Sequence, residues 1–217
     1  MISLFQISPA LFFSRVLALL FALTFHEFAH AWMAVKFGDE TPRWAGRLTL
    51  NPLKHLDPVG SLMLLLVGFG WAKPVPVNAY TLKRKHPAAL MMVALSGPLS
   101  NFLMAVIAAI PLRFGLFGPI YSDTSFTYNL YVFFANFMVI NLGLMLFNLL
   151  PIPPLDGEEV LAFILPQKAA YFYEQIRPYG SFILLGLLVL GQVTGFNLFS
   201  MILTPAANAI ANFLLGT

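Results

Sequence analysis

The sequence predicts an all-α polytopic membrane protein with about five transmembrane helices (four to six) and a re-entrant β-hairpin-like segment between the first two. Three observations predict this class. Apolar residues make up 59% of the 217 residues and charged residues only 10%, whereas soluble globular domains are about 45–50% apolar and about 25% charged. Uncharged stretches of about 18 or more apolar residues recur, as in transmembrane helices. Lysines and arginines gather in a few loops, which orients the spans across the bilayer.

Four long apolar segments are the candidate spans, at residues 9–35, 87–112, 127–150 and 178–217. The first is expected to be a permanent span, because it lacks the basic n-region and the A-x-A-like cleavage site of a signal peptide. The last has no charged residue and could hold one long span or two short ones. We favour two helices that meet near Gly195 and Asn197, because Gly191, Gly195 and Pro205 would interrupt a single helix.

The apolar run at 58–71 is too short to cross a hydrocarbon core about 30 Å thick, because a helix rises about 1.5 Å per residue. Basic residues lie on both sides of it: Lys36, Arg43, Arg47 and Lys54 before, and Lys73, Lys83, Arg84 and Lys85 after. The positive-inside rule places both flanks in the cytoplasm, so the run is expected to enter the membrane and return. Its tail alternates proline and valine from Pro74 to Val77, which favours an edge strand or hairpin over a helix.

Residues 26–30 have the sequence HEFAH in the middle of the first span. On a helix His26 and His30 lie one turn apart on the same face, so both imidazoles can bind one metal ion, and Glu27 can reach a water on that ion. This pattern is a known arrangement of zinc hydrolases. A purely structural role is disfavoured, because an acidic residue at the centre of a membrane helix costs about 2.5–3.5 kcal/mol on insertion scales. The other histidines, His55 and His86, lie beside lysines in basic loops, which indicates an interfacial surface.

A catalytic zinc site takes three protein ligands, and Asp156 in NLLPIPPLDGEEV is the strongest candidate for the third. The chain has no cysteine, which excludes thiolate ligands. The prolines within 151–154 end the preceding apolar helix near membrane depth, and Gly157 lets the backbone turn away so that the carboxylate can face the site. Glu158 and Glu159 are competitors, although they open the next helix and suit its positive N-terminal end.

Three motifs, in this order, resemble those of the site-2 protease family of intramembrane zinc metalloproteases. HEFAH matches the HExxH motif of the family's first core helix, and SGPLSNF at 96–102 matches the small-residue motif of the second. NLLPIPPLDG at 148–157 matches the Asn-x-x-Pro-x-Pro-x-Leu-Asp-Gly motif of the third, and GWAKPVPVN at 70–78 resembles the membrane-embedded hairpin. The resemblance covers about residues 10–165. It is to the short form of the family, because no stretch resembles the PDZ domain of many bacterial members.

The resemblance implies that His26, His30 and Asp156 bind one Zn²⁺ per chain and that Glu27 is the general base. It places the family's active-site asparagine at Asn148, where the side chain would hydrogen-bond the substrate carbonyl. Many members have LDGG followed by a basic residue, whereas this chain has LDGEE. That departure leaves the ligand unchanged and makes the approach to the site more acidic.

The predicted function is intramembrane zinc-dependent proteolysis: hydrolysis of peptide bonds within or near transmembrane segments of membrane proteins, as in regulated intramembrane proteolysis. We expect the strand around Val75 and Val77 to hold the substrate in extended form by main-chain pairing. The alternatives are a transporter or channel, and a zinc-binding membrane scaffold without proteolytic activity. The absence of a repeat disfavours the first, and Glu27 disfavours the second, because a structural zinc site needs no base.

We expect a single membrane-embedded metalloprotease domain over residues 1–217, with a core at 10–165 and C-terminal helices at 178–217. Its expected partners are the lipid bilayer and a membrane-protein substrate with a transmembrane segment, and no nucleic acid. The positive-inside rule places the N-terminus outside and residues 151–177 inside. The active site is therefore expected toward the cytoplasmic side of a bacterial or archaeal cell membrane. The sequence leaves the oligomeric state open.

Overall fold

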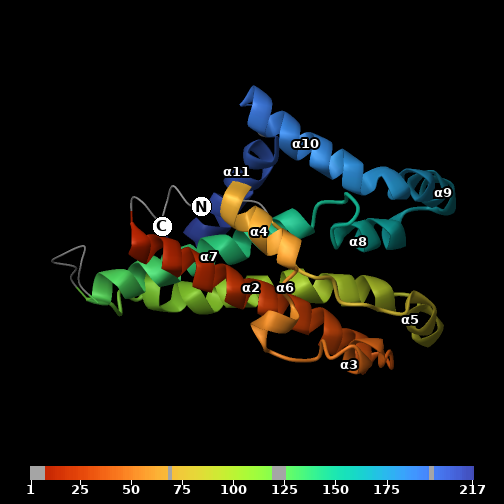
Figure 1. Ribbon diagram of the computed structural model, residues 1–217, viewed down its shortest axis with the longest axis horizontal. Helices are drawn as coiled ribbons and strands as arrows, with labels where there is room; N and C mark the ends of the chain where they lie inside the picture. Colours follow the sequence, from red (N-terminus) through yellow and green to blue (C-terminus); the bar gives the residue numbers. More distant parts are fainter. Residues whose placement is uncertain (1–7, 68–69, 119–125, 196–197) are drawn as a thin grey trace.

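The computed structural model describes residues 8–67, 70–118, 126–195 and 198–217. Within these ranges four helices are long and apolar enough to cross a membrane: α2 (Pro9–Lys36), α6 (Ala89–Arg113), α7 (Phe126–Asn148) and α11 (Leu198–Leu215). Figure 1 shows α2, α6 and α7 as long neighbouring helices that form the body of the molecule. The prediction of an all-α polytopic membrane protein is confirmed at this level.

The other helices of the described residues are shorter. They are α3 (Thr41–Trp44), η1 (Pro52–Lys54), α4 (Pro58–Val67), α5 (Ala79–Lys85), α8 (Gly157–Ile164), α9 (Gln167–Ile176), η2 (Arg177–Tyr179) and α10 (Gly180–Thr194). α10 has 15 residues, fewer than the roughly 20 that a straight transmembrane helix needs. Gly195 ends α10 in the left-handed conformation, with a φ of 73°. The last apolar stretch therefore forms two helices, as predicted, although Asn197, near which we expected them to meet, lies outside the described residues.

Small side chains allow α2 to pack closely on its neighbours. Ala18, Ala22 and Ala34 are fully buried, and their spacing places them on the same face of α2 as His26 and His30. A second layer lies where α6 meets α7, in a core of six buried residues: Ala105, Ala108, Ala109, Met138, Leu142 and Met145. The face of α2 that carries the histidines is thus turned into the helix bundle, where the two rings are buried.

The segment between α2 and α6 leaves the bundle and returns to nearly the same point. Its outgoing arm is α4, whose 10 residues extend about 15 Å. At its base the amide of Lys73 donates to the carbonyl of His55 at 2.8 Å, and Leu56 forms an antiparallel bridge with Ala72. The ends of the excursion are therefore held together, although residues 68–69 lie outside the described part of the chain.

The β-hairpin that we expected in this segment is not confirmed. Across the described residues the bridge between Leu56 and Ala72 is the only β interaction, and residues 74–77 are extended without a strand partner. Two physical reasons account for this difference: the outgoing arm is helical, and Pro74 and Pro76 have no N–H to donate to a ladder. The extended stretch ends where the amide of Asn78 donates to the buried carboxylate of Asp39 at 2.6 Å.

Candidate metal centre

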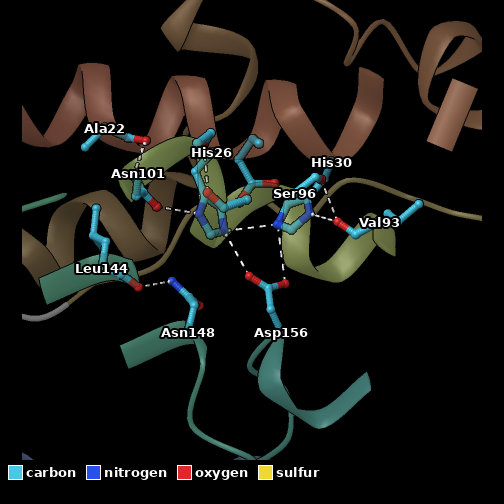
Figure 2. Close-up of polar contacts among 12 residues, drawn as sticks. Ala22, His26, His30, Val93, Ser96, Asn101, Leu144, Asn148 and Asp156 are labelled. Atoms are coloured by element: carbon cyan, nitrogen blue, oxygen red, sulfur yellow. Dashed lines mark hydrogen bonds and ion pairs between the residues drawn. The ribbon is translucent and has the colours of Figure 1, made fainter. Parts of the chain in front are cut away.

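Three side chains from two distant parts of the chain converge inside the bundle. His26 and His30 extend from α2, and Asp156 extends from the turn before α8 (Figure 2). The two imidazole Nε2 atoms are 3.0 Å apart. The Asp156 carboxylate places Oδ2 at 3.2 Å from Nε2 of His26 and Oδ1 at 3.3 Å from Nε2 of His30. Within the described residues this is the one group of three or more His, Cys, Asp or Glu side chains that could hold a metal ion.

The opposite ring nitrogens fix the protonation of both histidines. Nδ1 of His30 lies 2.8 Å from the carbonyl oxygen of Val93, which can only accept, so this Nδ1 carries the ring proton. Nδ1 of His26 lies 2.7 Å from Oδ1 of Asn101. The amide nitrogen of Asn101 donates to the carbonyl of Ala22 at 3.1 Å and to Oδ1 of Asn141 at 2.9 Å. Because the amide nitrogen of Asn101 makes these two bonds, the atom that faces His26 is the amide oxygen, which can only accept. Nδ1 of His26 therefore carries the ring proton, and Nε2 of each histidine is left with a lone pair.

A metal ion fits this arrangement chemically. Two Nε2 lone pairs and a carboxylate face one another at 3.0–3.3 Å, and acceptors this close repel unless a cation lies among them. Two imidazole nitrogens and one carboxylate oxygen are the donor set of a catalytic zinc site, which keeps a fourth position for water.

The position of Asp156 follows from the local sequence. α7 ends at Asn148, and the proline-rich turn leads to α8, for which Asp156 is the N-cap residue. Its carboxylate makes no capping bond to α8, so it is available to the histidines. Gly157 is not among the glycines with a positive φ, so the turn does not use the left-handed conformation. The turn needs a close approach of the backbone: a Cβ there would lie 2.2 Å from the carbonyl oxygen of Leu149.

Gly97 gives the two imidazoles their space. A Cβ at this position of α6 would lie 2.4 Å from Nε2 of His30 and 2.7 Å from Cε1 of His26. Real Cβ atoms do not tolerate such distances, and both rings are already held by their Nδ1 hydrogen bonds. The small-residue motif at 96–102 therefore provides space for the two imidazoles of the site.

Glu158 and Glu159 do not reach the histidines. Both carboxylates form ion pairs with Arg177, which also pairs with Glu174 and so fastens α8 to η2. Burial raises the pKa of Glu158 above its ordinary value, while the charge of Arg177 acts in the opposite direction. Burial and the nearby Glu158 carboxylate likewise raise the pKa of Tyr173 to about 12. Of the three candidate carboxylates for the third ligand, Asp156 is therefore the one that lies next to the histidines.

The remaining predicted residues surround this centre. Glu27 is buried on α2, with Oε2 3.9 Å from Nη2 of Arg47. Asn148 extends from the end of α7 toward the same side as Asp156 (Figure 2). One of its two amide hydrogens is donated to the carbonyl of Leu144 at 3.0 Å, so the other remains for a ligand.

Val75 and Val77 lie on the extended stretch, and no backbone hydrogen bond of the described residues involves either of them. The side chain of Val77 packs against a cluster that includes Val93, the residue whose carbonyl accepts from His30. The other two histidines lie elsewhere. His86 is exposed, but His55 is buried, with Nε2 2.8 Å from the carbonyl of Thr49, so its predicted place at an interfacial surface is wrong.

Sequence reasoning missed three residues of this site. Asn101 was included only as part of the small-residue motif at 96–102, Asn141 was not singled out, and Arg47 was counted among the basic loop charges. Both asparagines are fully buried. The available signal for them was an amide in an otherwise apolar helix, which indicates a buried hydrogen bond. No comparable signal distinguishes Arg47 from its basic neighbours.

Comparisons with known proteins agree with this chemistry. A protein of Bacillus subtilis (strain 168) named "Putative zinc metalloprotease YwhC" is 39% identical over 203 residues, which are 88% of this chain and 92% of that protein. Rip2 of Mycolicibacterium smegmatis, described in the same words, is 34% identical over 146 residues, 64% of this chain and 52% of Rip2. MJ0611 of Methanocaldococcus jannaschii, again described in these words, is 33% identical over 139 residues, 63% of each chain.

Peptidase family M50 matches residues 115–191, a range that includes Asn148 and Asp156. No solved structure matches the chain with statistical significance. The similarity to the Bacillus subtilis protein nevertheless extends over nearly the whole of both chains. The chain therefore belongs to peptidase family M50, the site-2 protease family, and is a zinc metallopeptidase.

Proposed function

We propose that this protein hydrolyses peptide bonds within or near the transmembrane segments of other membrane proteins, as in regulated intramembrane proteolysis. The observation that carries the proposal is the convergence of His26, His30 and Asp156 in the interior of a bundle of membrane-length helices. A site buried at this depth is accessible to a substrate that is itself in the membrane. The whole chain, residues 1–217, is the catalytic domain in this proposal, with the core at 10–165.

We assign the three converging side chains as the ligands of one Zn²⁺ per chain. Their mutual distances of 3.0–3.3 Å support this assignment, as does the pairing of each Nδ1 with an acceptor. When bound at such a site, zinc activates a water molecule and polarises the carbonyl of the scissile bond. The remaining chemistry falls to side chains that surround the ligands.

Glu27 is the general base and later the general acid. It follows the ligand His26 directly on α2, and its carboxylate takes a proton from the attacking water and returns it to the leaving amine. Asn148 is placed to orient the substrate: its second amide hydrogen can be donated to the carbonyl oxygen of the scissile bond, where negative charge develops. Because Asn148 is neutral, it supports this charge without competing for the metal.

The extended stretch around Val75 and Val77 holds the unwound substrate. Peptide bonds in a membrane helix are internally hydrogen-bonded, so a substrate must unwind before hydrolysis, and its freed N–H and C=O groups then need partners. The main-chain groups of Val75 and Val77 have no backbone partner within the described residues. An edge of this kind recognises backbone and not particular side chains.

The active site lies toward the cytoplasmic face in this proposal. His30 is six residues from Lys36 at the end of α2, and the loops at that end carry most of the basic residues. The protein is then a multi-pass protein of a bacterial or archaeal cell membrane, and its partners are the lipid bilayer and a membrane-protein substrate.

The test compares purified wild type with the Glu27→Gln and Asp156→Ala variants. Each is added to membranes isolated from cells that lack this protein, and new N-termini are identified by terminal labelling and mass spectrometry. We expect wild-type protein to generate new termini within or near transmembrane segments. Glu27→Gln should retain zinc without cleaving, and Asp156→Ala should lose most of its zinc. A wild-type enzyme that generates no Glu27-dependent termini would favour the transporter or scaffold alternative. Full zinc retention by Asp156→Ala would remove Asp156 from the ligand set.

A further inference from the structure

Arg47 connects the active site to the base of the re-entrant segment. It follows the short helix α3, where its own amide donates to the carbonyl of Pro42 at 2.8 Å. Its side chain turns inward and is only 4% exposed. There Nη2 donates a hydrogen bond to the carbonyl oxygen of Lys73 and lies 3.9 Å from Oε2 of Glu27. One guanidinium nitrogen thus faces both the general base and the backbone of the returning chain.

The environment of this guanidinium is unusual for a residue that serves stability alone. Burying a charged group is costly unless it is paired and fully hydrogen-bonded. The pairing is incomplete here: Nε has no hydrogen-bond partner among the residues that the structure describes, and 3.9 Å is longer than a hydrogen bond. Burial lowers the pKa of Arg47, and the charge of Glu27 acts in the opposite direction. Its two neighbours nevertheless depend on it, because removing the guanidinium alone would leave the buried Glu27 carboxylate and the Lys73 carbonyl without this partner.

The contact with Lys73 is made at a position that controls the extended stretch. The amide of Lys73 is bound by the carbonyl of His55, and its carbonyl is bound by Arg47. Pro74 follows immediately, and the chain then runs through Val75 and Val77 to Asn78, where Asp39 holds the other end. Arg47 therefore fixes the end of this stretch that is nearer to Glu27.

We propose that Arg47 is a positioning residue for proteolysis, which holds the substrate-binding stretch at a set distance from the Glu27 carboxylate. This inference rests on the proposed function. Arginine suits the role because its planar guanidinium presents several donors in a fixed geometry, so one side chain can hold a carbonyl and face a carboxylate together. A lysine has one flexible ammonium group and can keep the charge without holding the same geometry.

The experiment compares Arg47→Met, Arg47→Lys and a matched control, Arg43→Met. Arg43 lies in the same basic loop, but its side chain is 55% exposed and pairs only locally with Glu40. Four quantities are measured for each purified protein: zinc content, thermal stability, hydrogen exchange of residues 70–78, and the rate at which the wild-type set of new N-termini appears in isolated membranes. Arg43→Met should match wild type in all four.

Arg47→Met should keep its zinc, and its melting temperature should fall because the Glu27 carboxylate and the Lys73 carbonyl lose this partner. Its cleavage rate, measured below that melting temperature, should fall about 100-fold, which is typical when reacting groups are misplaced by about 1 Å. Residues 70–78 should exchange faster, with the exchange of α6 and α7 unchanged. Arg47→Lys should recover part of the activity. Should Arg47→Met fail to fold, the lysine variant is decisive: it should bind zinc normally and cleave at least tenfold more slowly than wild type.

Each contrary outcome points to one source. Cleavage within twofold of wild type by a folded Arg47→Met or Arg47→Lys variant, with unchanged exchange at 70–78, would overturn the role of Arg47 alone. Loss of zinc in parallel with activity would reassign Arg47 to structural support of the metal centre. The absence of any Glu27-dependent cleavage by the wild type would instead count against the proposed function. In that case faster exchange at 70–78 in Arg47→Met would still support the mechanical link to Lys73.

Discussion

At the scale of single residues, the metal centre depends on hydrogen bonds to the far side of each imidazole. A neutral histidine presents one N–H and one lone pair, and the partner of one nitrogen decides what the other can do. His30 donates to a backbone carbonyl, which no side-chain substitution can remove. His26 depends on the amide of Asn101, and Asn101 is oriented in turn by Asn141. The hydrogen bond that fixes His26 is therefore the one of the two that a side-chain substitution can remove directly.

Replacing Asn101 by leucine should lower the affinity for zinc by about 10–100-fold, the usual effect of removing the group that orients a metal-binding histidine. Leucine has a similar volume, so the helix packing is preserved, but His26 loses the acceptor that fixes its tautomer. The measurement is a competition titration of zinc against a chromophoric chelator. Asn136→Leu is the matched control, because Asn136 only donates to the carbonyl of Val132 on its own helix. Equal affinities in both variants would rule out this role for Asn101.

Gly97→Ala should abolish zinc binding or reduce it severely. The added methyl group would lie 2.4 Å from Nε2 of His30, and the ring cannot move aside without breaking its bond to Val93. Gly143→Ala on α7 is the control, because nothing lies within 4 Å of a Cβ at that position. Zinc content is measured by elemental analysis of purified protein. An alanine variant at position 97 with a full zinc complement would show that the rings can rearrange.

The sequence predicts part of this site and not the rest, for a physical reason. His26 and His30 follow from helical periodicity, because residues four apart share one face. Asp156 follows from the proline-rich break that ends the preceding apolar helix next to a carboxylate. Asn101 and Arg47 depend instead on which side chains two helices and a loop bring together. Pairing across 75 residues, as between His26 and Asn101, has no local pattern in the chain.

At the scale of elements, the segment at 58–78, which we predict to be re-entrant, shows where local sequence patterns stop being informative. The short length of the apolar run and its basic flanks correctly predict that it does not continue as a long helix. The extended conformation after Lys73 follows from its prolines. The same prolines remove the donors that a hairpin needs, so the described chain has one bridge in place of the expected strands. What remains is a free edge in residues 74–77, whose use stays a prediction.

Val75→Pro should reduce cleavage while leaving the zinc content unchanged, because it removes a main-chain N–H from the proposed substrate edge. Val75→Ala is the matched control: it shortens the side chain but keeps the N–H, so it should cleave at close to the wild-type rate. A helix-breaking residue near the scissile bond of a substrate should partly rescue the proline variant, because less unwinding is then required. Wild-type cleavage by Val75→Pro would mean that the unwound substrate is held elsewhere. The rate is measured as the appearance of new N-termini in isolated membranes.

At the scale of the whole molecule, four helices of the described residues are long enough to cross a membrane, and α10 is an apolar helix that is shorter than these. With 15 residues it falls short of a full span, although its side chains are apolar and largely exposed. Hydropathy alone identifies such a segment as membrane-embedded but does not state how deep it lies. The predicted range of four to six spans reflects this ambiguity. The sidedness of the loops can be tested independently of it.

Cysteine labelling should place Lys54 and Lys83 on one face of the membrane and Leu116 on the other. The chain has no cysteine, so the Lys54→Cys, Lys83→Cys and Leu116→Cys variants each carry one reactive thiol, which a membrane-impermeant maleimide reaches from one side only. α6, with 25 residues, is about 37 Å long and must separate Lys83 from Leu116. α4 is too short to separate Lys54 from Lys83, and its base is closed by the bond between Lys73 and His55. The Leu116→Cys variant should therefore be labelled in intact cells, and the two lysine variants only after lysis.

Labelling of Lys54→Cys and Lys83→Cys from opposite faces would contradict a re-entrant segment. It would also separate the end of α2, which carries His30, from the end of α7, which leads to Asp156, and so exclude a shared metal site in the membrane.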